Sequence, residues 1–262
     1  MTASYGARRA SLASAFRSET LKFKHSAPVR LAVALALPMP LLGAWPSMAT
    51  GVQTFSAWNY WYTLFLPVAL SLVTACVANA DARLKLRALL GQGAPLVHAW
   101  WAKALYCLAL SLLANIIVFA LYLLGSAFSS QGVTLAGTLS MLACAFANAL
   151  TTAWMIPVGL FLASRFGMLA GIFVPLVIQI AGEFAWSIIP LPQFFPPSAT
   201  MVVPTSFMPV LPSGEPLSAD MVLGGALAAD LPFTLAGLAV CAAVFVVFTA
   251  AGAVWLKGAE ER

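Results

Sequence analysis

Three polar residues spaced four apart interrupt one of the most apolar stretches of this chain. Gln179, Glu183 and Ser187 would share one helix face, because four residues advance an α-helix by little more than one turn. A carboxyl group such as that of Glu183 costs about 2.5 kcal/mol or more to insert into hydrocarbon. One interpretation is that this face lines a translocation path or contacts an opposing subunit. The other is that Glu183 lies near the outer membrane surface and bonds to neighbouring backbone, and the sequence supports both equally.

Milder polar residues lie in two other apolar segments. Asn148 joins the candidates for a path or interhelix contact, and Asn115, Thr151 and Thr152 are of similar character. Amide and hydroxyl side chains in membrane helices commonly hydrogen-bond to neighbouring helices. We therefore expect these residues to join helices more often than to bind ligands.

Residue clusters typical of enzymes are missing from the sequence. It contains no GxxxxGK[ST] phosphate-binding loop, no HExxH zinc motif and no GxSxG nucleophile elbow. His25 and His98 are far apart, and all four cysteines fall within apolar segments. The sequence predicts a protein that is not itself an enzyme and that has no metal site and no cofactor of its own.

The distribution of charge predicts the elements that hold these residues. Of 262 residues, 62% are hydrophobic and 8% are charged, and the 13 Lys and Arg fall into four short stretches between long apolar gaps. Each gap is long enough to cross a bilayer and return. Because cytoplasmic loops collect Lys and Arg, the pattern predicts an all-α polytopic protein of the cytoplasmic membrane with both termini inside. The basic residues would then face lipid headgroups, and nucleic acid is not an expected partner.

Six transmembrane helices are expected within one permease domain, residues 29–257. A cytoplasmic N-terminal segment (1–28) and a short cytoplasmic tail (258–262) flank it. The expected spans are roughly 29–47, 60–79, 101–125, 135–163, 168–189 and 231–256. Three prolines predict a kink or break in the first span. The aromatic run WNYWY at 58–62 is typical of a belt at headgroup level.

A short helix is expected at the cytoplasmic surface before the first span. Within residues 11–25, one face would carry Leu12, Phe16, Thr20 and Phe23, and the charged residues Arg17, Glu19, Lys22 and Lys24 would lie elsewhere. Such an amphipathic pattern favours a helix lying in the membrane interface. The residues expected to characterise it are Phe16, Arg17, Phe23 and Lys24.

A second short helix is expected between the second and third spans. The segment DARLKLRALL begins at Asp81 and is followed by Gly91, a common residue after a helix end. Its leucines indicate docking against lipid or a partner, and a cytoplasmic motor subunit could bind such a helix. The candidate coupling residues are Asp81, Arg83, Lys85, Arg87, Leu89 and Leu90.

The stretch at 190–230 is expected outside the cell and is rich in proline. It is too apolar for a free loop, and residues 199–210 are a candidate for a re-entrant segment. Backbone of that kind is tolerated at membrane depth only where protein or a water-filled cavity shields it.

The order of these motifs resembles a known family. The motifs are LKFKHS at 21–26, WNYWY at 58–62, Pro67 within the second span, RLKLRALL at 83–90 and WWAK at 100–103. Together they are similar to the permease subunits of ABC transporters that confer self-immunity to lantibiotics, the E/G-type subunits. The resemblance covers about residues 18–257 and is weakest after the fifth span.

The resemblance implies an ABC type-2 exporter-like membrane domain, with an interfacial helix at 11–25 and an ATPase-coupling helix at 81–90. It also implies a second permease subunit, either a copy or a paralogue, and a separate ABC ATPase that binds ATP and Mg²⁺. In that family the complex removes a cationic peptide from the membrane and releases it outside. The acids Glu215, Asp220 and Asp230 would suit such a cargo.

Other functions remain open on the sequence. An ABC type-2 exporter of another amphiphile, such as a drug, lipid or glycan, would use the same fold. An ion-coupled secondary carrier would require Glu183 to be a titrating group inside the membrane. A membrane-embedded enzyme or scaffold fits least, because no reactive cluster is present.

Overall fold

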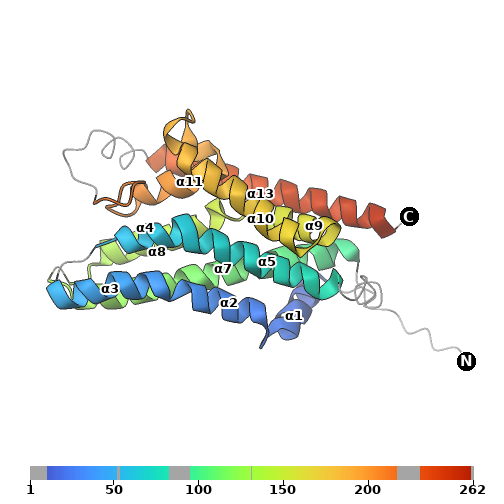
Figure 1. Cartoon of the computed structure of the whole chain (residues 1–262), viewed down its shortest axis with the longest axis horizontal. Coiled ribbons are helices and arrows are strands. Elements are labelled where there is room, and N and C mark those ends of the chain that lie inside the picture. Colours follow the sequence, from blue (N-terminus) through green and yellow to red (C-terminus); the bar gives the residue numbers. More distant parts are fainter. Residues whose placement is uncertain (1–10, 52–53, 83–94, 131, 217–230, 261–262) are drawn as a thin grey trace, which may run out of the picture.

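The computed structural model describes residues 11–51, 54–82, 95–130, 132–216 and 231–260, and these residues fold into one elongated helical bundle (Figure 1). Within these ranges, extended segments pair at an isolated bridge between Val210 and Pro216. The principal helices are α1 (Leu12–Phe23), α2 (Ala27–Ala36), α3 (Pro38–Thr50), α4 (Ser56–Tyr60), α5 (Leu66–Ala82), α7 (Leu96–Ala127), α8 (Leu135–Thr151), α9 (Met155–Phe166), α10 (Met168–Phe184), α11 (Pro196–Val202) and α13 (Leu231–Glu260). A π-helical turn (Trp61–Phe65) joins α4 to α5, and short 3-10 turns occupy Ala185–Ser187, Pro192–Phe194 and Val203–Ser206.

Five helical segments are long and apolar enough to cross a membrane. They are Ser56–Ala80, Leu96–Ala127, Leu135–Phe166, Met168–Ser187 and Leu231–Gly258. A sixth is obtained if Leu12–Phe23 and Ala27–Gly43, which meet at a bend of 76°, are taken together. The described residues therefore form an all-α protein with five or six helices able to span a membrane, in agreement with the predicted fold class at that level.

Breaks divide two of the expected spans, and the sequence predicted one of them. The first span changes from α2 to α3 directly before Pro38, whose ring cannot donate a backbone N–H to the preceding turn. The fourth span, expected as one helix, is divided between α8 and α9 at residues 152–154. At this break the Thr152 hydroxyl donates to the carbonyl oxygen of Asn148 at 2.8 Å, a local bond that competes with regular helix geometry.

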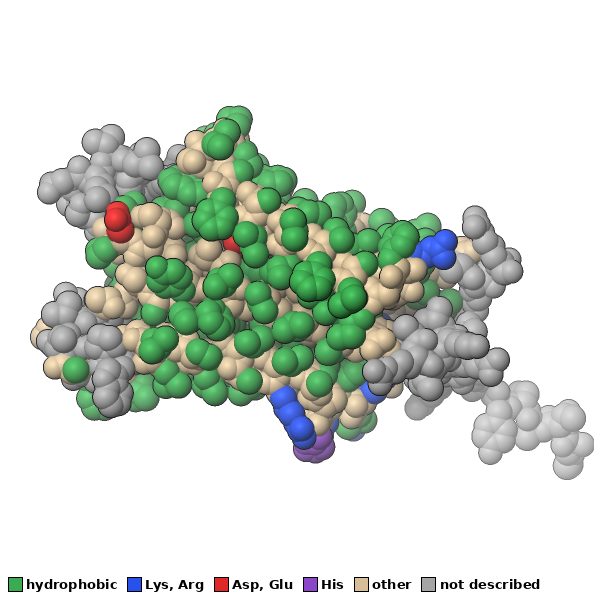
Figure 2. All heavy atoms as spheres, viewed as in Figure 1, with side chains coloured by type: hydrophobic (Ala, Val, Ile, Leu, Met, Phe, Trp, Pro, Cys, Tyr) green, Lys and Arg blue, Asp and Glu red, His purple; other side chains and the backbone are tan. Residues whose placement is uncertain are grey.

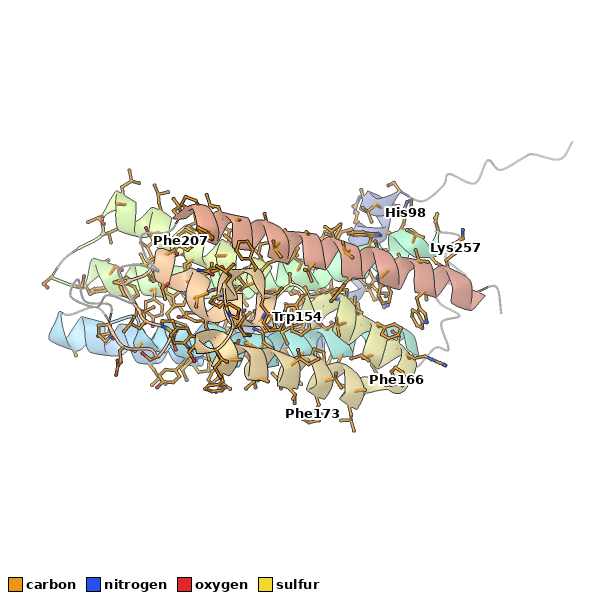
Figure 3. All side chains as sticks on the ribbon, turned by 90° about the horizontal axis from the view of Figure 1, so that it is seen from above. His98, Trp154, Phe166, Phe173, Phe207 and Lys257 are labelled. Carbon is orange, nitrogen blue, oxygen red and sulfur yellow. The ribbon has the colours of Figure 1, made fainter. Side chains whose placement is uncertain are left out.

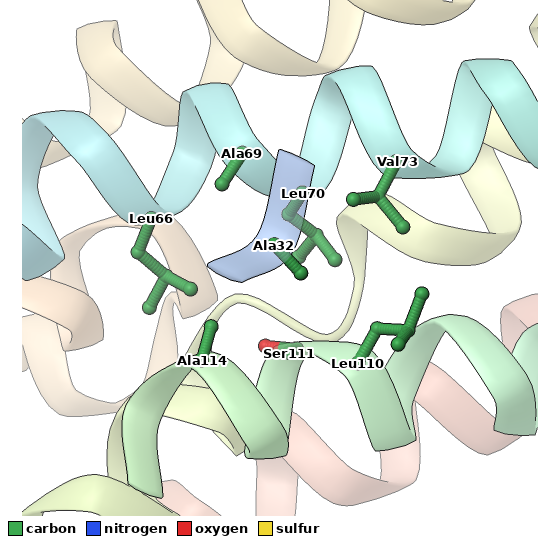
Figure 4. A pocket seen from close by; sticks show the side chains of 8 residues that line it. All are labelled: Ala32, Leu66, Ala69, Leu70, Val73, Leu110, Ser111 and Ala114. Carbon is green, nitrogen blue, oxygen red and sulfur yellow. The ribbon is translucent and has the colours of Figure 1, made fainter. Parts of the chain in front are cut away.

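The apolar interior forms two large clusters, one including Trp100 and Tyr106 and the other including Trp58 and Trp61. A cavity of about 10 Å³ lies where α2, α5 and α7 meet, lined by seven apolar side chains and Ser111 (Figure 4). The Ser111 hydroxyl is buried and has no hydrogen-bond partner among the described residues. A buried water needs two to four polar partners, and this space offers one hydroxyl, so it is too apolar to hold a water well.

The described Lys and Arg side chains lie at one end of the bundle, which we call the basic end. They belong to α1 and the starts of α2 and α7, and to the last turns of α9 and α13: Arg17, Lys22, Lys24, Arg30, Lys103, Arg165 and Lys257. Figure 2 shows some of the basic side chains at the right-hand end and on the lower edge, with a largely apolar flank, and Figure 3 places His98 and Lys257 at the basic end. The opposite end, here the far end, carries the exposed Glu215.

Candidate functional site

Glu183 and Gln179 are both completely buried on α10, one turn apart. The Gln179 amide nitrogen Nε2 donates to Glu183 Oε1 at 2.8 Å. The second oxygen, Oε2, has no hydrogen-bond partner among the described residues, and no Lys, Arg or His of these residues forms an ion pair with Glu183. The spacing noted in the sequence therefore brings these two side chains together inside the protein.

Gln179 connects α10 to two other elements. The indole Nε1–H of Trp154 donates to Gln179 Oε1 at 2.7 Å, and Gln179 Nε2 donates to Thr200 Oγ1 at 2.9 Å. Trp154 lies at the start of α9, near the middle of the bundle in Figure 3, and Thr200 lies on α11. We call these four residues, Trp154, Gln179, Glu183 and Thr200, the central polar cluster.

Two local features of the chain bring this cluster together. The break between α8 and α9 places Trp154 at a helix start, beside α10. Gly182 permits close approach of α11 to α10, because a Cβ atom at this position would collide with Pro197. The Ser198 hydroxyl donates to the Gly182 carbonyl oxygen at 2.6 Å and fastens the two helices. A glycine in an apolar helix often marks a place where another helix packs closely. Gly182 was therefore the sequence signal that could have predicted a segment packed against this point of α10.

The segment around α11 folds back into the bundle. All residues from 196 to 205 are buried, and the segment packs against α8, α10 and α13. The sequence made 199–210 a candidate for a segment that re-enters the outer leaflet, and its depth in a membrane stays a prediction. The surrounding helices shield the backbone of residues 196–205, as such a segment would require.

Two of the residues expected to line a path or to join helices, Ser187 and Asn148, do not belong to the central polar cluster. Ser187 is exposed, because α10 ends at Phe184 and the following 3-10 turn redirects the chain, so the expected three-residue stripe has two members. Asn148 is completely buried and its Nδ2 lies 3.7 Å from the sulfur of Cys144. No hydrogen bond joins Asn148 to Gln179 or Glu183 within the described residues, so Asn148 stands outside the central polar cluster.

The expected aromatic belt at 58–62 is largely wrong. Trp58, Trp61 and Tyr62 are buried, and Tyr60 is the exposed aromatic ring of the run. The segment after α11 covers them: Asn59 Nδ2 donates to the Tyr62 hydroxyl at 2.7 Å and to the carbonyl oxygens of residues 211 and 212 at 3.3 and 3.2 Å. These residues hold the far-end segment in place and do not contact headgroups as a belt would.

The helix expected before the first span is present as α1, and its buried face differs in part from the prediction. Phe23 is buried and stacks on Tyr106, Phe16 is half-buried, and Arg17 and Lys24 are exposed. Sequence reasoning assigned Glu19 to the polar face. Glu19 is instead buried, with its Oε1 accepting from Lys103 Nζ at 3.1 Å. This ion pair joins α1 to α7.

The expected coupling residues fall mostly outside the described part of the chain. These are Arg83, Lys85, Arg87, Leu89 and Leu90. The backbone of Asp81 belongs to the last turn of α5 and does not begin a separate helix. The coupling role assigned to these residues therefore stays a prediction.

The central polar cluster is a hydrogen-bonded network of neutral donors and acceptors around one carboxyl group. Its members are an amide, a carboxyl, a hydroxyl and an indole, and the described residues include no group of three or more His, Cys, Asp or Glu placed to hold a metal ion. No protein-family model, curated protein or solved structure matches the chain. Any functional conclusion therefore depends on the sequence and geometry of the chain itself.

Proposed function

We propose that this chain is the permease subunit of an ABC exporter that expels a lantibiotic or similar cationic peptide from the membrane. A separate ATPase subunit would bind ATP and Mg²⁺, and a second permease subunit, a copy or a paralogue, would complete the complex. The basic end is the cytoplasmic end in this proposal, because Lys and Arg collect on the cytoplasmic side of membrane proteins. Both termini would then be cytoplasmic.

The placement of α1 is the observation that supports this function best. α1 meets the following helix at 76° and packs against α7, the helix that follows residues 83–94. The family resemblance implies an interfacial helix before the first span and a coupling helix between the second and third spans, and α1 is a helix of the first kind that packs against the helix following the second. Force applied to residues 83–94 would pass to α7 and, through Lys103 and Glu19, to α1.

Purification of the tagged chain from its native membrane in mild detergent, followed by mass spectrometry, tests the proposal. We expect a stoichiometric ATPase carrying a phosphate-binding loop. Replacing Arg83, Lys85 and Arg87 by Ala should reduce co-purification of the ATPase and leave membrane insertion intact. A matched control replaces Arg30, Arg165 and Lys257, three exposed cations at the same end of the bundle, and should retain the ATPase. A folded, active chain without any ATPase would refute the proposal.

A second candidate function is ion-coupled transport through Glu183. It is favoured by one observation, the complete burial of this carboxyl group without a cationic partner among the described residues. An intramembrane ionisable residue is a functional hypothesis by default. This function requires that Glu183→Gln abolish transport by the chain in the absence of an ATPase. The competing explanation is structural: the carboxyl group is buried because it accepts the hydrogen bond from Gln179.

A further inference from the structure

A pocket of about 230 Å³ opens at the far end of the bundle and includes none of the central polar cluster. Its walls are Phe55 before α4, the end of α7, residues 132–134 with the first turns of α8, and residues 207–209 after α11. Figure 3 shows Phe207 in the half of the bundle opposite to His98 and Lys257. Four separated parts of the chain therefore converge on one site.

The lining is apolar and hydroxylic and contains no charged side chain. Met141 and Met208 are buried, and their unbranched side chains can adapt to groups of different shape. Thr138 already donates its hydroxyl to the carbonyl oxygen of Thr134 at 2.9 Å. Ser140 is half-buried and makes no hydrogen bond within the described residues, so its hydroxyl is available to a ligand.

The volume limits what the pocket can hold. A cavity of about 150 Å³ accommodates benzene, so about 230 Å³ suffices for one aromatic or branched side chain and excludes a whole peptide. We propose that this pocket binds one large apolar side chain of a cationic peptide, with the Ser140 hydroxyl donating to a neighbouring peptide carbonyl. This inference rests on the proposed function and adds a recognition site to it.

Position and charge favour a peptide over a lipid tail as the occupant. The pocket opens among loop residues at the end of the bundle, whereas the exposed apolar side chains of α10 and α13 lie along its flank. Glu215 is exposed on the segment that also supplies residues 207–209, and Asp220 follows it in the sequence. A cationic residue beside the bound side chain would be attracted to the Glu215 carboxylate, whereas a neutral acyl chain would gain nothing from it.

Binding of two matched peptides tests the pocket. The sample is the intact chain, together with any subunits that co-purify with it, in phosphatidylcholine nanodiscs. The probe is a fluorescent heptapeptide alternating Lys and Gly around one central Phe, and its twin carries Ala in place of Phe. We expect the Phe peptide to bind about tenfold more tightly, the usual discrimination of an apolar pocket. Ser140→Phe would fill the pocket and remove this preference. Leu139→Phe adds the same ring at an exposed neighbouring position of α8 and should keep it.

Photo-crosslinking locates the bound side chain without any protein variant. A peptide with benzoylphenylalanine at the centre should label residues 137–141 or 207–209. Equal binding of the two peptides, or labelling confined to α10 and α13, would overturn the inference even if Ser140→Phe fails to fold. Labelling of the pocket by a photoreactive phosphatidylcholine that the Phe peptide does not displace would also overturn it.

The outcomes separate this inference from the proposed function. A Phe preference in a chain that carries no ATPase would keep the pocket as a peptide site and reject the exporter. An ATPase that co-purifies with a chain lacking the preference would keep the exporter and reject the pocket.

Discussion

Two carboxyl groups of the described residues are buried, and their surroundings differ. Glu19 at the basic end is 4% exposed and pairs with Lys103, also 4% exposed. Glu183 in the central polar cluster is 0% exposed and accepts one hydrogen bond from the neutral amide of Gln179. In each, the second carboxyl oxygen has no hydrogen-bond partner among the described residues.

The difference reflects what each site has to accomplish. α1 is short and packs chiefly against α7, so one charged contact adds specificity to a small apolar interface. The central polar cluster instead joins three elements around Gln179, and a neutral network does so without placing a full charge pair in the apolar interior. A buried ion pair adds little net stability to a fold, but removing one of its partners is strongly destabilising.

The largest expected effect follows from breaking the ion pair on one side. Lys103→Met would remove the nearer and buried cation from the Glu19 carboxylate, leaving only the more distant Lys22, and should lower the free energy of unfolding by about 3 kcal/mol. Thermal unfolding in detergent, followed with a thiol-reactive dye, measures this because Cys107, Cys144 and Cys241 are buried. Lys22→Met is the matched control. Its amine lies 3.8 Å from the same oxygen and is partly exposed, so its loss should cost less than about 1 kcal/mol.

Equal melting temperatures for the Lys103 and Lys22 variants would contradict this ranking. They would mean that α1 is held by Phe23 and its stacking partner alone, and that the two buried carboxyl groups are energetically alike.

The sequence predicted an all-α protein with several helices able to span a membrane, and the shared face of Gln179 and Glu183 on α10, but not the partners from elsewhere in the chain. Apolar periodicity and the Lys and Arg distribution suffice for the helices, and a four-residue spacing suffices for Gln179 and Glu183, because both are local properties. Glu19 looked like a surface residue because its partner is 84 positions away. Trp154 and Thr200 were not recognised because their positions depend on a helix break and on a returning segment, neither of which has a periodic signal.

Replacing each buried glutamate by glutamine compares the two sites directly, and we expect an effect of medium size. Glu19→Gln keeps an acceptor oxygen for Lys103 but removes the negative charge, so an ion pair becomes a hydrogen bond to a neutral amide, and this should cost roughly 2 kcal/mol. Glu183→Gln faces a neutral amide and should cost less than about 1 kcal/mol, because the new amide oxygen can accept the same hydrogen bond. The same dye measurement gives both values.

The Glu183 variant also tests whether this carboxyl group has a part in the proposed transport. Peptide resistance in cells should persist at normal expression if the carboxyl group only holds α10 in its network. Loss of resistance in a stably folded Glu183→Gln protein would show that the carboxyl group is needed for transport and not only for the hydrogen-bond network. Glu183 would then be a functional acid and Glu19 a structural one.

The smallest expected effect extends the contrast to uncharged groups. Ser198 and Ser111 are both buried, but Ser198 donates to the Gly182 carbonyl oxygen at 2.6 Å, whereas the Ser111 hydroxyl faces an apolar cavity with no partner among the described residues. Ser198→Ala should therefore cost about 1–2 kcal/mol, and Ser111→Ala about zero or a slight gain. Parallel melting curves measure the difference. Equal losses of stability at both positions would contradict this prediction. They would mean that the Ser111 hydroxyl is hydrogen-bonded after all, and that the hydrogen bonds seen in this structure do not determine how much each buried hydroxyl contributes to stability.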